Sequence, residues 1–333
     1  MTRSRTVVLT ATLSALALSG CSPTAARQAS SGEVIVTNCE EQVRFPSPAR
    51  RLFVNDSNLI SMVLALGAEN QVTAVSSLNR DQGVLTKHYG PAVAELNQVS
   101  DDYPSLETVI AQRPDVMVAG WNYGYDEAKH LTPDALATHG IGAYVLTESC
   151  RQEGGSARGI VDPWTALRND LTNLGRITGH TTEAEDVTAD LNARLDALAH
   201  APQAKRAPVL FVFDSAGKAI FTSGAFGAPQ AIIEAAGGRN AVDDLKNSWT
   251  EVSWERLAAA PPDAFLFVDY PGQTFEQKVA ILRAHPATRN LPAVKQERFL
   301  NLPYAMWTSG PLNIDAAEQT REALERWEVL PAR

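Results

Sequence analysis

The chain alternates short apolar runs with helical patterns, and it does so in two separate blocks. Strands that alternate with helices build a largely parallel sheet with helices on its faces. In the first block the apolar runs predict strands near residues 51–54, 72–75, 115–119 and 143–146. In the second block they predict strands near residues 209–213, 219–222, 264–268 and 298–302. We therefore expect an α/β protein with two lobes, each a mostly parallel sheet flanked by helices.

A long helical stretch separates the two blocks. Apolar residues recur there at three- and four-residue steps, at Trp164, Leu167, Leu171, Leu174 and Ile177. The helix is expected to start at the Asp162-Pro163 cap and to be interrupted by Gly179. Thr182 and Glu185 then predict a capping box for a second helix. About fourteen helical residues span about 21 Å, which suits a stiff connection between lobes; the alternative is that both helices pack on one lobe.

A short motif occurs once in each block. Ser105-Leu106-Glu107 is followed by Pro114-Asp115, and Ser253-Trp254-Glu255 is followed by Pro262-Asp263, at an offset of 148 residues. Each copy reads as a short helix that leads into a buried strand. The repeat supports two equivalent lobes.

The N-terminus has the layout of a secretory signal peptide, with Arg3 and Arg5 before an apolar run over residues 7–18. That run is too short to cross the ~30 Å hydrocarbon core of a membrane as a helix. It ends in Leu18-Ser19-Gly20-Cys21, which resembles the lipobox of bacterial lipoproteins and makes Cys21 a lipid attachment point outside the cytoplasm. The alternative is an ordinary signal peptide in which Cys21 has no role.

These observations divide the chain into five segments. We expect a leader at 1–20, a flexible tether at 21–32, an N-terminal lobe at 33–160, connecting helices at 161–200 and a C-terminal lobe at 201–333.

Cysteine usage agrees with an extracytoplasmic location. The chain has three cysteines, so removing Cys21 leaves the pair Cys39 and Cys150. In an oxidising compartment we favour a disulfide between them. Two unpaired thiols remain the alternative.

Composition and motifs exclude several classes of function. The formal net charge of −9 argues against a nucleic-acid-binding protein. The chain carries no G-x-S-x-G, H-E-x-x-H, Walker or G-x-G-x-x-G motif. Its six histidines show no metal-ligand spacing, so we expect neither a cofactor nor a directly bound metal. Asp214-Ser215 follows an expected strand, but no histidine motif supports Ser215 as a nucleophile.

Aromatic residues gather in the loops that follow expected strands, where open α/β sheets bind ligands. Because these rings sit beside Gly and Asn, we expect them to line a cleft. The candidate ligand-binding residues are Trp121, Tyr123, Tyr125, Ser223, Phe226, Tyr304 and Trp307, with Arg80 and Arg239 as candidate cations.

From about Val34 to the C-terminal helix, the chain resembles the solute-binding lipoproteins of ABC importers for ferric siderophores, haem and cobalamin, the class III periplasmic binding proteins. The residues that carry this resemblance are Pro48-Ala49-Arg50-Arg51, Leu64-Ala65-Leu66-Gly67-Ala68, the two Ser-x-Glu motifs, and Ala235-Ala236-Gly237-Gly238. The resemblance implies a ligand cleft between lobes joined by a backbone helix. It also implies one glutamate per lobe, here Glu107 and Glu255, that docks on an ABC permease.

The resemblance further implies a monomeric, lipid-anchored protein that captures a small molecule and has no enzymatic activity. An aromatic cleft poor in histidine favours an iron(III)-siderophore complex over cobalamin or haem. Two alternatives of other classes remain: an extracytoplasmic hydrolase that uses Ser215, and a lipoprotein that binds a protein partner instead of a small ligand.

Overall fold

The structure, a computed structural model, describes residues 32–78, 80–153 and 155–333. The expected leader and residues 21–31, with Cys21, lie outside this part of the chain. Within it, no helix has both the length and the apolar character that a membrane crossing requires.

The N-terminal lobe is built on a parallel sheet of six strands. The order is β5-β4-β3-β6, with β7 and β8 both pairing with β6. The strands are β3 (Leu52–Asn55), β4 (Val72–Ser76), β5 (Gln98–Ser100), β6 (Val116–Trp121), β7 (Gly124–Tyr125) and β8 (Gly142–Val145). Around them lie α1 (Ser57–Ala65), α2 (Gln82–Tyr89), α3 (Leu106–Ala111), α4 (Pro133–Ala137) and the short 3₁₀ helices η1 (Glu69–Gln71), η2 (Pro91–Glu95) and η3 (Thr147–Ser149).

The C-terminal lobe contains two sheets. Its parallel sheet has the order β12-β9-β14-β15, formed by β9 (Val209–Phe213), β12 (Arg239–Asn240), β14 (Ala264–Asp269) and β15 (Phe299–Pro303). All five residues of β9 are buried, as expected for a strand covered on both faces. A second, antiparallel sheet consists of β10 (Ser215–Ala216), β11 (Ile220–Ser223) and β13 (Trp249–Val252). The expected strand at 219–222 therefore forms, but in this antiparallel sheet.

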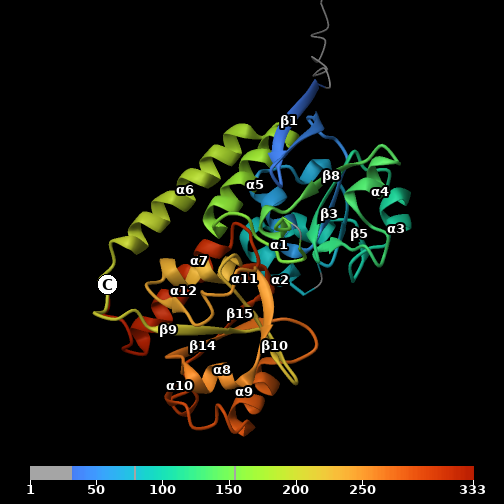
Figure 1. Cartoon of the computed structure of the whole chain (residues 1–333). Helices are drawn as coiled ribbons and strands as arrows, with labels where there is room; N and C mark the ends of the chain where they lie inside the picture. The colour runs from blue at the N-terminus through green and yellow to red at the C-terminus, as the bar shows by residue number, and fades with distance from the viewer. Residues whose placement is uncertain (1–31, 79, 154) are drawn as a thin grey trace, which may run out of the picture. The chain divides into compact units, whose positions relative to one another are not determined.

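Helices cover the C-terminal strands on two sides. Figure 1 shows α7 (Ala228–Ala235) and α12 (Asn313–Arg326) on one side and α8 (Trp254–Ala259), α9 (Phe275–Ala284) and α10 (Pro292–Lys295) on the other. The short helix α11 (Tyr304–Trp307) follows β15 directly.

Two helices connect the lobes. α5 (Pro163–Thr178) begins at Asp162, whose side chain accepts a hydrogen bond from the Thr165 amide, and it ends at Gly179 in the left-handed conformation. It packs against η3 of the N-terminal lobe and against α7 of the C-terminal lobe. α6 (Thr181–Ala199) follows at once, with His180 as an N-cap that makes no side-chain bond. The capping box expected at Thr182 is therefore wrong, because the helix already contains that residue.

A β-hairpin precedes the first lobe, and the apolar pattern did not predict it. β1 (Gly32–Asn38) pairs with β2 (Glu41–Ser47), and Cys39 and Glu40 turn between them with positive φ angles of 49° and 67°. Asn173 and Arg176 of α5 donate hydrogen bonds to the carbonyls of Thr37 and Ile35. The turn is joined to the N-terminal lobe by a disulfide between Cys39 and Cys150.

Candidate functional site

Four side chains between the lobes directly follow the carboxyl ends of parallel strands. Asp56 follows β3, Asp214 follows β9, Tyr270 follows β14 and Tyr304 follows β15. Since such strand ends meet at one edge of each sheet, this arrangement brings the side chains of both lobes to one place. A cavity of about 270 Å³ lies there, lined by Tyr103, Asn122, Tyr123, Arg158, Asp214, Phe221, Trp249, Tyr270 and Tyr304. We call this the central cavity.

Two further cavities adjoin the central one. A cavity of about 470 Å³ shares Asp214, Phe221 and Tyr270 with it and extends along β10 toward Gln273. A third, of about 330 Å³, is lined by Arg80 and by the loop after β14. The volumes of the two adjoining cavities fall in the range of sites for small organic molecules, roughly 300–1,000 Å³, and the volume of the central cavity lies just below it.

Asp56 holds two of the cavity's phenols. Its Oδ2 accepts hydrogen bonds from Tyr103 Oη at 2.8 Å and from Tyr304 Oη at 2.9 Å. The residue is fully buried and has a φ of 76°, an uncommon backbone conformation for a side chain other than Gly. Burial raises the pKa of Asp56, and burial also raises the pKa of both phenols well above the ordinary value.

Glu148 is a second buried carboxylate at the junction of the lobes. It accepts hydrogen bonds from Tyr123 Oη at 3.0 Å, from Trp249 Nε1 at 3.1 Å, from the Ser309 amide at 3.1 Å and from the Ala228 amide at 3.3 Å. Burial raises its pKa, against the opposing effect of the Arg158 charge. Four donors compensate for the loss of water around this side chain.

Three guanidinium groups lie over aromatic rings, and two of these pairs line the cavities. The Cζ atom of Arg80 lies 4.5 Å from the Tyr270 ring centre, and that of Arg158 lies 5.4 Å from the ring of Tyr123. Arg151 lies 3.7 Å over Trp121. Such contacts stabilise a cation by about 0.5–2 kcal/mol and fix its position. The Nη1 atom of Arg80 is buried and has no hydrogen-bond partner among the described residues.

No group of three or more His, Cys, Asp or Glu side chains suited to a metal ion occurs within residues 32–78, 80–153 and 155–333.

The sequence profile of the family described as "Periplasmic binding protein" matches residues 55–305, most of the chain. The chain belongs to this family of periplasmic binding proteins. Members are substrate-binding proteins, not enzymes, that work outside the cytoplasm, carry small-molecule ligands and serve ABC permeases. The hydrolase alternative at Ser215 is thereby removed.

Individual relatives agree with this family. A vitamin B12-binding protein of Pectobacterium carotovorum is 26% identical over 223 residues, which cover 65% of this chain and 72% of the relative. A periplasmic binding protein from Veillonella parvula shares the fold with a TM-score of 0.74 at 20% identity, covering 89% of this chain and 98% of that one. An ABC-type Fe³⁺-hydroxamate transport protein of Saccharomonospora viridis has a TM-score of 0.73 at 20% identity, covering 87% and 98%.

Three of the candidate residues lie in the cleft of this periplasmic binding protein. Tyr123 and Tyr304 line the central cavity, and Arg80 lines the adjoining cavity of about 330 Å³. Trp121 is half-buried and lines none of the three cavities; it packs against Arg151 and against Tyr125.

Two rings expected in the cleft are core residues instead. Tyr125 is fully buried, and its hydroxyl donates to the carbonyls of Met117 and Tyr144. Trp307 is also fully buried, with its indole N–H donated to the carbonyl of Phe267. The hydroxyl of Tyr125 and the indole N–H of Trp307 both find their acceptors within their own lobe, so we leave these residues out of the proposed ligand site.

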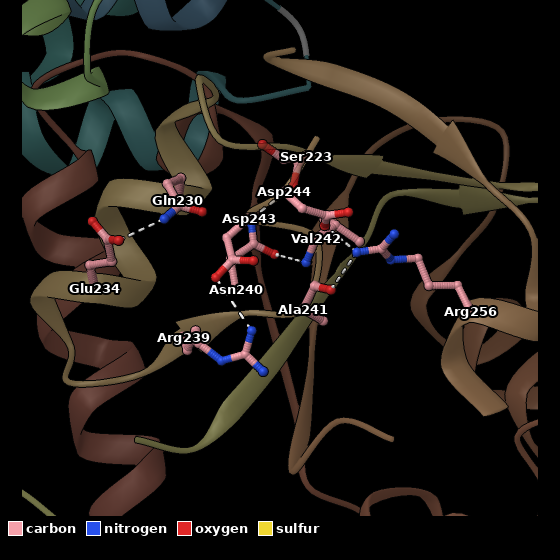
Figure 2. A network of polar contacts seen from close by, with 10 residues as sticks. All are labelled: Ser223, Gln230, Glu234, Arg239, Asn240, Ala241, Val242, Asp243, Asp244 and Arg256. Atoms are coloured by element: carbon pink, nitrogen blue, oxygen red, sulfur yellow. Dashed lines mark hydrogen bonds and ion pairs between the residues drawn. The ribbon is translucent and has the colours of Figure 1, made fainter. Parts of the chain in front are cut away.

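Ser223, Phe226 and Arg239 also lie outside the lining of the three cavities. Figure 2 shows the Arg239 side chain directed toward Asp243. The two form an exposed ion pair, with Nη1 of Arg239 3.3 Å from Oδ2 of Asp243. The side-chain amide of Asn240 donates a hydrogen bond to the carbonyl of Ser223. Ser223 is fully buried and donates to the carbonyl of Ser248. Phe226 packs against Gly159.

Sequence reasoning missed several cavity residues. Tyr270 comes two residues after the expected strand at 264–268, so its position alone could have identified it. Phe221 and Trp249 belong to the antiparallel sheet, and Arg158 comes from a loop of the other lobe. No local pattern places these three beside the cavity.

Proposed function

We propose that this protein captures an iron(III)-siderophore complex between its lobes and delivers it to an ABC permease. The observation that carries the proposal is the central cavity, with its wall of aromatic rings and phenols from both lobes. Rings bind the organic body of a ligand through apolar contact and stacking, while hydroxyl groups fix its orientation. An iron ion that is already coordinated by its organic chelator presents such an organic surface to the cavity.

The adjoining cavities and the arginines support a large, partly anionic ligand. The three cavities share lining residues and together extend well beyond the space that a bare ion occupies. Arg80 and Arg158 lie along them, and the unpartnered Nη1 of Arg80 is a donor suited to a ligand oxygen. One structural relative is a protein of an Fe³⁺-hydroxamate transport system.

The test is a fluorescence titration of the purified protein with ferrioxamine B, ferric enterobactin, haemin and cyanocobalamin. We expect a ferric siderophore to quench tryptophan emission with saturation, and the iron-free chelator to bind at least tenfold more weakly. Trp249→Phe should remove most of the quenching, whereas Trp164→Phe, in helix α5, should retain it. Binding of none of these compounds would overturn the proposal.

Haem is the second candidate, favoured by one observation. Tyr270 is half-buried in the wall of the cavity, and Arg80 lies over its ring. A tyrosine side chain is a known axial ligand for haem iron. Haemin bound in this way should show a shifted Soret band in absorption, which Tyr270→Phe abolishes. Saturable binding of cyanocobalamin alone would instead favour a cobalamin carrier.

We also propose that Glu107 and Glu255 contact the permease. Both are exposed, and each is the second residue of a short helix, α3 or α8, that follows a serine N-cap. A hydrogen bond from Ser105 lowers the pKa of Glu107, and one from its own amide lowers the pKa of Glu255. Each lobe thus presents one ionised carboxylate at an equivalent position, which suits two equivalent arginines.

We propose, finally, that Cys21 carries the lipid that anchors the protein. The support is the lipobox-like Leu18-Ser19-Gly20-Cys21 sequence after an apolar run. Cys21→Ser should move the protein from the membrane fraction to the soluble extracytoplasmic fraction. Mass spectrometry should find a diacylated N-terminal cysteine in the wild type. An unmodified mature N-terminus would contradict the anchor.

A further inference from the structure

One oxygen of Glu148 binds both walls of the central cavity. Tyr123, from the N-terminal lobe, donates its hydroxyl to Oε1 at 3.0 Å. Trp249, from the C-terminal lobe, donates its indole N–H to the same oxygen at 3.1 Å. Both rings line the cavity. Because hydrogen bonds are short and directional, the position of this oxygen fixes the separation of the two rings.

The other oxygen binds the backbone of the C-terminal lobe. Oε2 accepts from the amides of Ala228 at 3.3 Å and Ser309 at 3.1 Å. Ala228 is the first residue of α7, and the N-cap of that helix, Gly227, supplies no side-chain acceptor. The first amides of a helix need acceptors and favour a negative charge. A residue of the N-terminal lobe therefore caps a helix of the C-terminal lobe.

The surroundings of Glu148 leave it little freedom to move. The side chain is 1% exposed and belongs to η3, whose neighbouring residue Thr147 is bonded to Asp170 of α5. The segment is held on its other side by the disulfide at Cys150. The Glu148 side chain is thus held by the connecting helix and the N-terminal lobe. Three of its four hydrogen-bond donors, Trp249, Ala228 and Ser309, belong to the C-terminal lobe.

We propose that Glu148 is the positioning residue of the ligand site. It sets the spacing between Tyr123 and Trp249, and it couples that spacing to the relative placement of the lobes through Ala228 and Ser309. The role in ligand affinity rests on the function proposed above. The role in positioning the rings is a property of the ligand-free protein and is tested separately.

The ligand-free test uses the indole N–H signal of Trp249 in the ¹⁵N NMR spectrum, assigned by its loss in Trp249→Phe. Glu148→Gln keeps the side-chain size but replaces one acceptor oxygen by an amide donor, so four donors cannot all be satisfied. We expect this signal to move and its proton to exchange with water at least tenfold faster. Tyr123→Phe, which frees one lone pair on Oε1, should also move it. An unchanged Trp249 signal in both variants would overturn the proposal.

The affinity test compares Glu148→Gln with Asn58→Ala. The side-chain amide of Asn58 donates a hydrogen bond to the Ser309 carbonyl at 2.8 Å. This control therefore removes another contact between the lobes at Ser309, the residue that Glu148 also binds, and Asn58 does not line the central cavity. Glu148→Gln should weaken binding of whichever chelate the wild type accepts by at least tenfold. Asn58→Ala should stay within threefold, even at an equal loss of melting temperature. Equal losses of affinity in both variants would contradict a specific role for Glu148.

A double variant separates positioning from general weakening. If Trp249 acts through its bond to Glu148, the combined Glu148→Gln, Trp249→Phe variant should lose little more affinity than the worse single variant. Fully additive losses would contradict the coupling. Should the wild type bind no chelate at all, the proposed function fails, whereas the NMR result still decides whether Glu148 positions the rings.

Discussion

Several buried carboxylates of the N-terminal lobe make hydrogen bonds within that lobe or across to the C-terminal lobe. Asp56 binds two phenols, Glu148 binds both cavity walls, and Asp81 accepts from the Ser57 hydroxyl. Burial raises the pKa of each of them, to about 6 for Asp81. Stability of this protein should therefore depend on pH through groups that are costly to ionise when folded.

Asp170 of α5 gives the clearest case. It accepts hydrogen bonds from Tyr144 Oη at 2.7 Å and from Thr147 Oγ1 at 2.6 Å, and burial raises its pKa from 3.8 to about 7. Between about pH 4 and pH 7, the folded protein therefore keeps the proton on Asp170, whereas the unfolded chain has released it. The stabilisation is complete below about pH 4 and is lost as pH rises toward about 7; the whole effect is at most about 4 kcal/mol.

Asp170→Asn should remove that dependence. The free energy of unfolding, measured by urea denaturation between pH 4 and 8, should fall less with rising pH than in the wild type. Asp186→Asn, at an exposed position of α6, is the matched control and should leave the wild-type slope. Parallel curves for the wild type and Asp170→Asn would contradict the prediction.

Gly124 shows how one residue turns the chain beside the site. Its φ is 116°, and a Cβ atom there would lie 2.8 Å from Asn55 Nδ2, the group that donates to the Tyr123 carbonyl. Gly124→Ala should destabilise the protein by about 1–3 kcal/mol, through backbone strain and this contact. Gly217→Ala, where nothing lies within 4 Å, should stay within about 0.5 kcal/mol. Equal melting temperatures for the two variants would contradict this account.

The same turn explains why only part of the expected aromatic cluster lines the central cavity. Tyr123 and Tyr304, which were expected from their position after a strand, do line it. Tyr125 lies only two residues beyond Tyr123, yet the turn at Gly124 places it in β7 with its ring in the core. Ring direction after a strand end depends on local backbone angles, and these do not follow from residue type.

At the scale of elements, buried parallel strands were the most predictable part. β9 was expected with its observed bounds, and β14 within one residue, because each is a continuous apolar run between polar turns. The β1–β2 hairpin was missed because few of its positions are buried and one apolar residue, Ile35, points to solvent, so its residues form no continuous apolar run. Its stability comes from contacts with α5 that lie far away in the sequence.

The disulfide fixes this hairpin to the end of the N-terminal lobe. It joins residues 111 positions apart, so by the chain-entropy argument it contributes on the order of 4 kcal/mol. Reductant should lower the melting temperature of the wild type by at least 5 °C in differential scanning calorimetry. The Cys39→Ala, Cys150→Ala variant should start lower and show no response to reductant. A wild type that is insensitive to full reduction, verified by thiol titration, would show that the hairpin does not depend on this bond.

At the scale of the whole molecule, the lobes share a continuous apolar core through α5. Leu167, Leu171 and Leu174 belong to one buried cluster. This cluster also includes residues of the parallel sheet of each lobe, such as Val54 in β3 and Leu266 in β14. The connecting helix and the hydrogen bonds of Asn58 and Glu148 also join the two lobes. The repeat of the Ser-x-Glu motif was visible in the sequence; the packing of each copy against its own sheet was not.

This arrangement bears on how the permease recognises the protein. Glu107 and Glu255 start equivalent helices in two lobes whose relative placement the core constrains. A permease with two symmetric arginines would then meet both carboxylates at once, and each exposed ion pair adds only about 0–1 kcal/mol. Reversal of charge should act more strongly than neutralisation, since it replaces attraction by repulsion.

Glu107→Arg with Glu255→Arg should therefore abolish uptake and stimulation of the permease ATPase in proteoliposomes, while ligand affinity stays within twofold of the wild type. Each single reversal should retain part of the stimulation, because the other lobe still docks. Glu276→Arg, at an exposed helix start of the C-terminal lobe outside the repeat, is the matched control and should transport normally. A double reversal that transports at the wild-type rate would show that docking uses another surface, and lost ligand affinity would show that these glutamates belong to the cleft.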